Sequence, residues 1–575
     1  MHAPLPAAHG RREPAFADLF TPKLVTILRE GYGVAGLRAD ALAGLTVAIV
    51  ALPLSMAIAI GAGVSPERGL YTAIVGGFLI SLIGGSRFQI GGPAAAFISL
   101  VALVVSRHGY DGLVLATMIA GLILLVIGFL QLGTYVKYIP YPVTVGFTAG
   151  IATIIMVTQL RDLLGLNLDK EPAEFLPKVA ALWNAIGTIS PVTVALSVFS
   201  IATILLVRRY RPNWPSLLIA VVLAAIMTAG LQLNVETIGT RFGAIASGLP
   251  APSIPTFSVE KLRAVFPDAV AIALLGAIES LLSAVVADGM TGRRHRSNCE
   301  LVAQGVGNFA AAACGGVPVT GTIARTATNI RAGARGPVAG MFHSLYLLLF
   351  VLFAMPLVAY IPLAALAGVL VVVAWSMADK AEFAVLLRSS RADALILLAT
   401  FLLTIFYDLL TGIGVGVVLG SFLFLHRMAE TIEVEGDPQF VREDTSDRAD
   451  GRPPYQGLRN GNVMTYRISG AFFFGATARV NLILDRVVKP PRVFILDFSD
   501  VPFIDITAAA ALERFVHRLH KAGSKVYFAG VRPHVRRSFG LPGLRGRAVH
   551  YVASVERALR ASASNGEPAQ TPAQH

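Results

Sequence analysis

Long apolar runs alternate with short polar connections over the first three quarters of the chain. Between residues 41 and 428 this pattern predicts about fourteen apolar segments, numbered one to fourteen in chain order: 41–60, 69–84, 93–106, 112–132, 142–160, 191–207, 214–231, 268–287, 298–313, 323–336, 337–355, 363–377, 392–407 and 410–427. A lone helix needs about 20 apolar residues to cross the hydrocarbon core of a bilayer. Several segments, including segments three and ten, are too short to cross in that way.

The composition changes the picture from a multidomain soluble chain to a polytopic membrane protein. Of the 575 residues, 55% are hydrophobic and only 14% are charged, whereas soluble proteins carry about 25% charged residues. This excludes an ordinary cytosolic enzyme and a disordered scaffold. We expect a polar cytoplasmic lead-in over residues 1–40, a transmembrane domain over 41–428, an α/β domain over 440–561 and a disordered tail over 562–575.

The net charge of +13 is distributed unevenly over the connections. Connections after even-numbered segments are basic, as with Arg208 and Arg209 after segment six, and Arg293 and Arg294 after segment eight. Connections after odd-numbered segments are mixed or acidic. Because cytoplasmic loops are enriched in Lys and Arg, this predicts that both termini are cytoplasmic, in a bacterial inner membrane. It also accounts for the charge without a nucleic-acid partner.

Two related blocks of seven segments, about 41–231 and 268–428, indicate an internal repeat. Segment three follows Gly91, Gly92 and Pro93, and segment ten follows a similar Gly/Pro-rich stretch that ends at Gly321. Seven is an odd number, so the second block is inverted relative to the first. Short, interrupted segments at matching positions of inverted repeats indicate the binding site of a transporter.

A helix that begins in the middle of the membrane has unpaired N–H groups and a positive dipole at its start. Two such starts that face each other would form an anion site at the midplane. The extended stretches before them, 88–91 and 317–320, would have to be shielded from lipid. The alternative is that these Gly/Pro clusters are only loops between short buried helices.

Segment eight carries a carboxylate in its middle, Glu279. An ionisable side chain inside a membrane is costly and is functional by default. Glu279 could carry a proton, coordinate Na⁺ or pair with a cation; a purely structural salt bridge is the alternative. Ser283 lies one turn later on the same face of the helix, so its hydroxyl could complete the site.

Arg325 lies in the first turn of segment ten. Its guanidinium fork suits carboxylates and tetrahedral oxyanions; the alternative is a structural partner for Glu279. Thr322 and Thr326 flank this turn, and their hydroxyls could bind a ligand or cap the helix. Ser55 in segment one is a further candidate contact, with a hydrogen bond to its own helix as the alternative.

Five stretches resemble the SulP anion permeases, a family that includes sulfate permeases, bacterial bicarbonate and dicarboxylate transporters, and prestin. They are ALPLSMAIAIGAGVSPERGLYTA (51–73), GGSRFQIGGPAAAF (84–97), GAIESLLSAVVAD (276–288), SNCELVAQGVGN (297–308) and PVTGTIARTATNI (318–330). The resemblance implies a seven-plus-seven inverted-repeat fold with a core and a gate domain. It further implies elevator-like transport of an anion, and a homodimer.

The resemblance also places the substrate between the starts of segments three and ten. There the first residues of the two helices, Ala94, Ala95, Ala96 and Ile323, would bind the anion through their backbone. The family links its acidic position in segment eight, which Glu279 matches, to Na⁺ or proton coupling.

Arg325 matches a basic position of many SulP members. Two hydroxyls that many relatives have are missing, because Ala94 replaces a Thr and Ala324 replaces a Ser. This leaves the anion open and places more weight on backbone N–H groups.

The C-terminal region resembles a STAS domain, named for sulfate transporters and anti-sigma-factor antagonists. We expect strands at 463–470, 492–500 and 525–531, and helices at 476–488, 507–522 and 552–561. Relatives that act as phosphorylation switches have Ser or Thr after the residue equivalent to Asp505, where this chain has Ile506. We therefore expect a scaffold or dimerisation role, or contact with a cytoplasmic protein partner. We interpret Thr507 as a helix N-cap; the alternative is that Thr507 takes the place of the switch residue.

The sequence thus predicts a secondary active anion transporter, with sulfate as the family default. Bicarbonate or a C4-dicarboxylate is the alternative substrate, and an uncoupled exchanger or channel is the alternative mechanism. A membrane-tethered STAS sensor is the alternative from another class. We find no Walker A loop, nucleophile elbow or His-Glu-x-x-His motif, so we expect no enzyme, no cofactor and no metal site beyond a coupling H⁺ or Na⁺.

Overall fold

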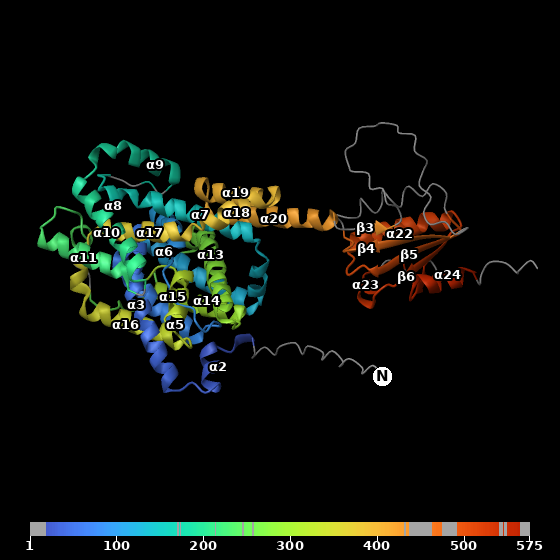
Figure 1. Cartoon of the computed structure of the whole chain (residues 1–575), viewed down its shortest axis with the longest axis horizontal. Helices are drawn as coiled ribbons and strands as arrows, with labels where there is room; N and C mark the ends of the chain where they lie inside the picture. Colours follow the sequence, from blue (N-terminus) through green and yellow to red (C-terminus); the bar gives the residue numbers. More distant parts are fainter. Residues whose placement is uncertain are drawn as a thin grey trace, which may run out of the picture. The chain divides into compact units, whose positions relative to one another are not determined.

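A computed structural model of the chain divides into two compact units, Met1–Val418 and Leu419–His575, and both are drawn in Figure 1. The structure describes residues 19–168, 172, 174–212, 214–243, 247–255, 258–430, 433–435, 463–473, 491–539, 544 and 549–563. The two units are considered separately.

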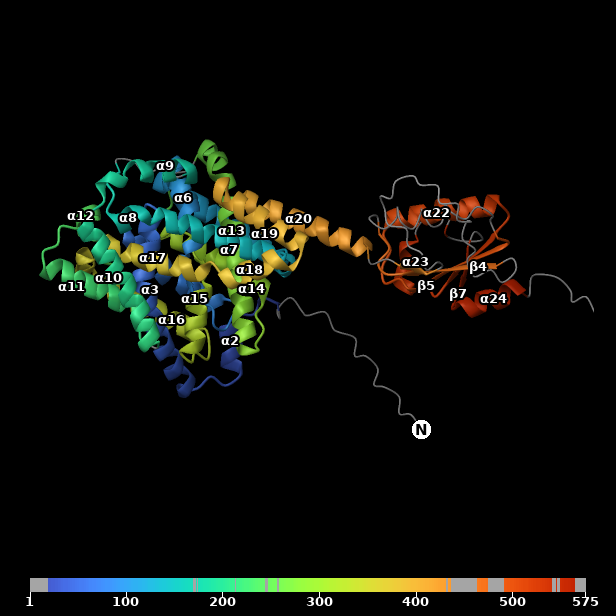
Figure 2. The ribbon, with the colours of Figure 1, turned by 45° about the horizontal axis from the view of Figure 1, so that its top comes forward.

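The first unit is helical apart from two short strands (Figures 1 and 2), and every predicted apolar segment contains helix; the last segment lies in a helix that continues past Val418. The first repeat contains α3 (Val34–Gly61), α4 (Pro66–Tyr71), the π-helical turn η1 (Thr72–Gly76), α5 (Gly77–Ile83), the 3₁₀ turn η2 (Ala95–Phe97), α6 (Ile98–Phe129), α7 (Tyr141–Thr158), α10 (Pro191–Tyr210) and α11 (Ser216–Gly230).

The second repeat contains α13 (Val259–Thr291), α14 (Ser297–Ala313), α15 (Ile323–Arg331), α16 (Val338–Phe353), α17 (Leu363–Met377), α19 (Arg391–Phe406) and α20 (Leu409–Glu430). The connections contain α2 (Lys23–Arg29), η3 (Leu132–Tyr138), α8 (Leu160–Leu164), α9 (Phe175–Asn184), η4 (Ile186–Thr188), α12 (Ile238–Phe242), η5 (Met355–Tyr360) and α18 (Lys380–Ser389). Within the described chain, seven helices are long and apolar enough to cross a membrane.

Three details differ from the predicted segments. The predicted loop between segments three and four is reduced to a kink at Gly109, whose φ of 68° is readily adopted only by glycine. Segment two is not one regular helix, because η1 interrupts it with a π-helical turn, a feature frequent at functional sites. Segment ten is shorter than predicted, since α15 ends at Arg331.

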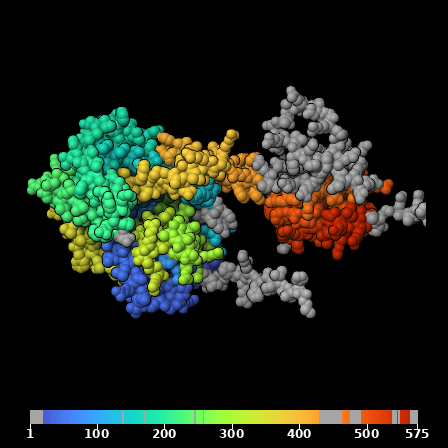
Figure 3. Space-filling model, in the orientation of Figure 1, coloured from blue at the N-terminus to red at the C-terminus, as the bar shows by residue number. Residues whose placement is uncertain are grey.

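The helices form a core and a gate. In the core, α6 packs against α13 and α14, α3 packs against α16, and α13 packs against α15. In the gate, α7 packs against α17 and α19, and α10 packs against α11 and α17. Figure 3 shows the green residues of segments six and seven gathered in one half of the unit, and the blue residues of segment one in the other. The fold is therefore the predicted seven-plus-seven arrangement.

The two repeats are also joined inside the gate. Ile238 N donates a hydrogen bond to Ile361 O (2.9 Å), and Leu363 N donates to Glu236 O (3.0 Å). Arg241 forms ion pairs with Asp162, at 2.7 Å, and with Glu236. The hydrogen bond from Arg241 holds the pKa of Glu236 below its usual value. The two backbone hydrogen bonds tie the connection after segment seven to the start of segment twelve. The ion pair with Asp162 ties the same connection to the one after segment five.

The second unit contains a five-stranded sheet of order β3-β4-β5-β6-β7. Among the described strands, β3 is antiparallel to its neighbour β4, and the other neighbouring pairs are parallel. The strands are β3 (Glu433–Glu435), β4 (Val463–Ser469), β5 (Val493–Asp500), β6 (Lys525–Ala529) and β7 (His550–Val552), and the helices are α22 (Ile506–Lys521), α23 (Pro533–Ser538) and α24 (Val555–Ala563). Buried aromatic residues such as Phe494, Phe498 and Phe528 form its core.

Some expectations for this unit were wrong. Thr507 is not the N-cap of α22; Asp505 is, and its side chain accepts a hydrogen bond from Ala508 N at 2.8 Å. The last helix begins at Val555, because 550–552 form β7. The strand β3 lies before residue 440 and was not predicted. The predicted helix 476–488 lies outside the described residues, as does 564–575 of the predicted disordered tail.

Close contact between α6 and α14 depends on glycines. A Cβ atom on Gly305 would lie 2.7 Å from Gly121 O and 2.9 Å from Leu125 N, and a Cβ atom on Gly121 would lie 2.7 Å from Gly305 O. Backbone atoms of both helices therefore approach each other directly, as small residues allow at helix interfaces in membranes.

We predict that Gly305→Leu destabilises the protein by about 1–3 kcal/mol or more, because the new side chain must separate two backbones that touch. Thermal unfolding of the purified protein in detergent measures the effect. The control is Gly289→Leu in α13, since a Cβ atom at Gly289 meets nothing within 4 Å. Equal melting temperatures for the two variants would contradict the predicted packing.

Candidate functional site

Two short strands from opposite repeats meet inside the core. The strand β1 (Gly91–Gly92) pairs antiparallel with β2 (Thr320–Gly321), with Gly91 opposite Gly321 and Gly92 opposite Thr320. All four residues are buried. Thr322 N also donates to Ile90 O, at 3.0 Å. The pairing satisfies backbone groups that lipid could not satisfy. In both repeats the strand overlaps only the last residue of the predicted extended stretch, 88–91 or 317–320.

A helix begins directly after each strand. In the first repeat the N-cap is Ala94 and the turn η2 follows; in the second the N-cap is Thr322 and α15 follows. Neither helix start has a side-chain cap, so the first N–H groups have no partner within their helix. Ile323, in the first turn of α15, is 38% exposed. The two uncapped starts lie beside the same strand pair, which is the arrangement that the predicted anion site requires.

Arg325 lies against this crossing. Its side chain is 1% exposed, and Nη2 donates a hydrogen bond to Pro93 O in the other repeat at 2.9 Å. Nε and Nη1 have no hydrogen-bond partner. A Cβ atom on Gly92 would lie 2.0 Å from Nη1, so the guanidinium occupies the space that this glycine leaves. A buried cation with two free donors is suited to an anion.

Glu279 faces the same region from α13. Its Oε2 atom is buried and has no hydrogen-bond partner. Glu279 and Arg325 are within electrostatic range of each other, yet no ion pair joins them among the described residues. The described structure therefore does not support the alternative in which Glu279 forms a direct salt bridge with Arg325.

The hydroxyls of three candidate residues bind protein groups. Thr326 Oγ1 accepts hydrogen bonds from Ile90 N and from Ser283 Oγ, both at 3.1 Å. Thr322 Oγ1 donates to Ile90 O at 3.4 Å. Ser283, Thr322 and Thr326 thus connect α13 and α15 to the stretch that leads into β1. None of them caps α15 through its side chain.

Ser55 is fully buried, and its Oγ atom has no hydrogen-bond partner. Its backbone oxygen lies against Gly69 of α4, where a Cβ atom would come within 2.0 Å. The hydroxyl therefore does not bond back to its own helix. A contact between Ser55 and the substrate stays a prediction.

Sequence reasoning missed three buried polar residues near the crossing. Thr320 Oγ1 donates to Gly276 O of α13 at 3.1 Å. Both amide atoms of Gln89 lack partners, and its Nε2 lies where a Cβ atom of Gly321 would be. Both ring nitrogens of His343 in α16 also lack partners. The available signal was a polar residue inside an otherwise apolar stretch, which in a membrane usually faces the protein interior.

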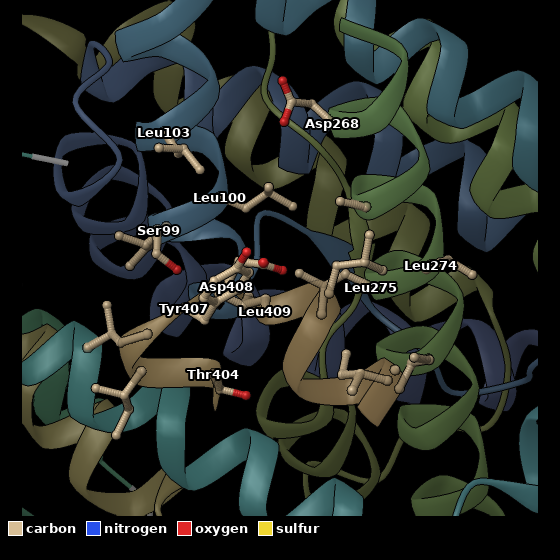
Figure 4. A pocket seen from close by; sticks show the side chains of 18 of the residues that line it. Ser99, Leu100, Leu103, Asp268, Leu274, Leu275, Thr404, Tyr407, Asp408 and Leu409 are labelled. Atoms are coloured by element: carbon tan, nitrogen blue, oxygen red, sulfur yellow. The ribbon is translucent and has the colours of Figure 1, made fainter. Parts of the chain in front are cut away.

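A cleft of about 1120 Å³ separates core helices from gate helices. Figure 4 shows Ser99, Leu100 and Leu103 of α6 on one side, Leu274 and Leu275 of α13 on another, and Thr404 and residues 407–409 on the gate side. The cleft reaches Ile98 at the start of α6 and Ile278 beside Glu279, but its lining does not include Glu279 or Arg325. The crossing is thus close to the cleft without lining it.

The part of the chain that the structure describes contains no cluster of three or more His, Cys, Asp or Glu side chains that could hold a metal ion. The chemistry of the crossing is that of hydrogen-bond donors, one cation and one unpaired carboxylate. Hydrogen-bond donors and a cation are the groups that recognise an anion, and an unpaired carboxylate is a group that takes up a proton or a cation.

Comparison with known proteins matches residues 37–400 to the sulfate permease family and residues 458–558 to the STAS domain. The chain is 37% identical over 505 residues to the putative sulfate transporter YvdB of Bacillus subtilis, covering 88% of this chain and 93% of that protein. It is 31% identical over 514 residues to the bicarbonate transporter BicA of Synechocystis, covering 87% and 89%. The inward-facing structure of murine Slc26a9 has a similar fold, with a TM-score of 0.82 at 18% identity over 97% and 96% of the chains.

We predict that Gly92→Ala lowers anion uptake at low substrate concentration about tenfold, because the added methyl group displaces Nη1 of Arg325. The protein should still fold, since the displaced atom is the end of a flexible side chain. Initial uptake rates in proteoliposomes measure this, with Gly289→Ala as a control that has open space around it. Equal uptake by both variants would mean that the position of Arg325 is unimportant.

Proposed function

The chain belongs to the sulfate permease family, and from this premise we propose that it is a secondary active transporter of a small anion, sulfate by family default. Bicarbonate and C4-dicarboxylates are the alternative substrates. We place the protein in the cytoplasmic membrane with both termini in the cytoplasm, on the basis of the basic even-numbered connections.

The observation that carries the proposal is the crossing of β1 and β2 with Arg325 beside it. Backbone N–H groups of Ala95, Ala96 and Ile323 and the free Nε and Nη1 atoms of Arg325 are all donors. An anion that only accepts hydrogen bonds matches this set, because every oxygen can be bound without an acceptor from the protein. Sulfate is such an anion at neutral pH. Bicarbonate also donates one hydrogen bond, for which Glu279 would be the available acceptor.

Glu279 is the proposed coupling group. Its Oε2 atom lacks a partner, so a proton or a Na⁺ ion would satisfy a buried carboxylate that is otherwise costly. Ser283 follows on the same face of α13, although its hydroxyl donates to Thr326. Coupling then follows from charge. A proton or Na⁺ bound to Glu279 cancels the negative charge of its carboxylate, so the core moves less net negative charge across the membrane together with the anion.

The proposed mechanism is movement of the core against the gate. The crossing, Arg325 and Glu279 all belong to the core, and the cleft separates core from gate. Moving the core as one body would carry the site across the membrane without opening a continuous pore. An uncoupled exchanger or channel is the alternative, and it would need no carboxylate beside the anion.

The resemblance to SulP proteins adds two further proposals. The protein would form a homodimer, and the STAS domain would act as a scaffold or bind a cytoplasmic partner. A signalling sensor is the competing function from another class, and deletion of residues 440–575 distinguishes the two. After this deletion a sensor would lose its signalling output while anion uptake persisted. A transporter without a signalling role has no such output to lose.

Uptake of labelled sulfate, bicarbonate and succinate into proteoliposomes, under imposed Na⁺ and pH gradients, tests the proposed function. We predict that Glu279→Gln abolishes gradient-driven accumulation, because a neutral amide cannot release a proton or balance Na⁺. Exchange of labelled anion without a gradient should persist. The control is Glu260→Gln in the first turn of the same helix, where Glu260 is exposed. Accumulation by Glu279→Gln that still follows the gradient would exclude the coupling role.

We predict that Arg325→Ala weakens anion binding by about 1–3 kcal/mol, a range that spans ordinary and charge-assisted hydrogen bonds. The KM for uptake should rise about five- to 150-fold, and Arg325→Lys should recover only part of it, because an ammonium lacks the fork. Arg331→Ala is the control, since Arg331 is exposed at the other end of α15. An unchanged KM in Arg325→Ala would show that helix N-termini suffice.

A further inference from the structure

The helix α14 carries a stripe of three buried polar side chains that the proposed transport cycle has not used. Glu300, Gln304 and Asn308 follow one another at intervals of four residues, so they lie on one face of the helix. Each is at most 1% exposed. Polar side chains are costly inside a membrane domain unless they bind protein groups, so their partners indicate what they do.

Glu300 binds the connection that leads into β1. Its Oε2 atom accepts hydrogen bonds from Gly85 N at 2.9 Å and from Ser86 N at 3.0 Å. Its Oε1 atom accepts a hydrogen bond from Gln304 Nε2 at 2.9 Å. Three donors and the first turn of a helix stabilise a carboxylate without a cation. Glu300 thus fastens the first repeat's connection to α14.

Asn308 binds the stretch that leads into β2. Its Nδ2 donates to Val319 O at 2.7 Å, and its Oδ1 accepts from Val319 N at 3.0 Å. One side chain therefore pairs both backbone groups of Val319, as a neighbouring strand would. Nδ2 also donates to Gln304 O at 2.9 Å. Asn308 thus fastens the second repeat's connection to the same helix.

We propose that Glu300 and Asn308 are positioning residues of the anion site, which hold both broken-helix connections in register on α14 without touching the anion. The path to the anion is short. Val319 directly precedes Thr320, Thr320 pairs with Gly92, and Gly92 lies against Nη1 of Arg325. A shift of Val319 along α14 moves the strand pair and with it the donors of the site. This inference rests on the proposed anion transport.

The competing role for Glu300 is that of a second proton carrier, and an isosteric variant separates the two roles. In Glu300→Gln the amide oxygen can still accept from Gly85 N and Ser86 N. Its new NH₂ group needs an acceptor, and Oε1 of Gln304 has no partner, so rotation of the Gln304 amide supplies one. A positioning role therefore survives this change, whereas a proton carrier is lost.

The test compares KM and maximal rate for sulfate uptake in proteoliposomes made from the full-length protein. The variants are Asn308→Ala, Glu300→Ala and Glu300→Gln, with Asn308→Asp as a second variant should the alanine fail to fold. The matched control is Asn298→Ala. Asn298 is also a buried asparagine of α14 that accepts a backbone hydrogen bond, but from Gly133 N (3.1 Å), away from the crossing. Melting temperatures in detergent are recorded for all.

We expect Asn308→Ala and Glu300→Ala to raise KM about tenfold or more at a maximal rate per folded transporter within about threefold of wild type. Asn308→Ala and Asn298→Ala should both lower the melting temperature. Asn298→Ala and Glu300→Gln should nevertheless keep the wild-type KM. A merely structural role would lower stability without changing KM.

An unchanged KM in Asn308→Ala, or in Asn308→Asp, overturns the inference while uptake by the wild type still supports transport. Loss of uptake in folded Glu300→Gln overturns it as well, since the charge would then matter more than the hydrogen bonds. If the wild type neither takes up nor is stabilised by sulfate, bicarbonate or succinate, the proposed function fails and this inference fails with it.

Discussion

The structure depends on one constraint: backbone that leaves helical geometry at the middle of a membrane must find its hydrogen bonds within the protein. The chain meets it by pairing β1 with β2, two residues from each repeat. Glycine at three of these four positions lets side chains approach the backbone directly, as Arg325 does at Gly92 and Gln89 does at Gly321. A helix begins directly after each strand of this pair, so the solution to a stability problem also creates the proposed anion site.

The rest of the core supports this pairing. Thr326 and Thr322 bind Ile90 in front of β1, and Thr320 binds Gly276 of α13. On the other side α14 binds both connections and packs on α6 through glycines. Because close-packed interiors deform little, we expect these contacts to keep the proposed site and its surrounding helices together as one unit. Such rigidity is what movement of a whole core against a gate requires.

The fourteen apolar segments and the place of the broken helices could be predicted from the sequence, because both depend on local patterns. Apolar runs give the segments, and Gly/Pro clusters at matching positions give the crossing. Long-range pairing could not be predicted, since Glu300 and Gly85 are 215 residues apart. A break between segments three and four was predicted from the polar residues around Gly109, but the structure shows a kink within one helix, because glycine can adopt the positive φ that a sharp bend requires. Asp505 was missed as a cap because Thr507 is an equally good capping residue type.

The two repeats share a backbone plan but contribute unequally to the chemistry. At the repeat spacing of 228, the position that corresponds to Arg325 is Phe97, and it is buried and apolar. The first repeat therefore supplies backbone donors, whereas the second supplies both the cation and the carboxylate.

This asymmetry has a physical consequence for the proposed carrier, whose core would also return without its substrate. Two arginines facing each other would leave the empty site with a net buried charge, which is costly. Arg325 and Glu279 together leave a formal charge near zero. In the described chain Glu279 Oε2 and two guanidinium nitrogens of Arg325 have no partner. The two side chains therefore have no salt bridge to break before the anion and the coupling ion bind.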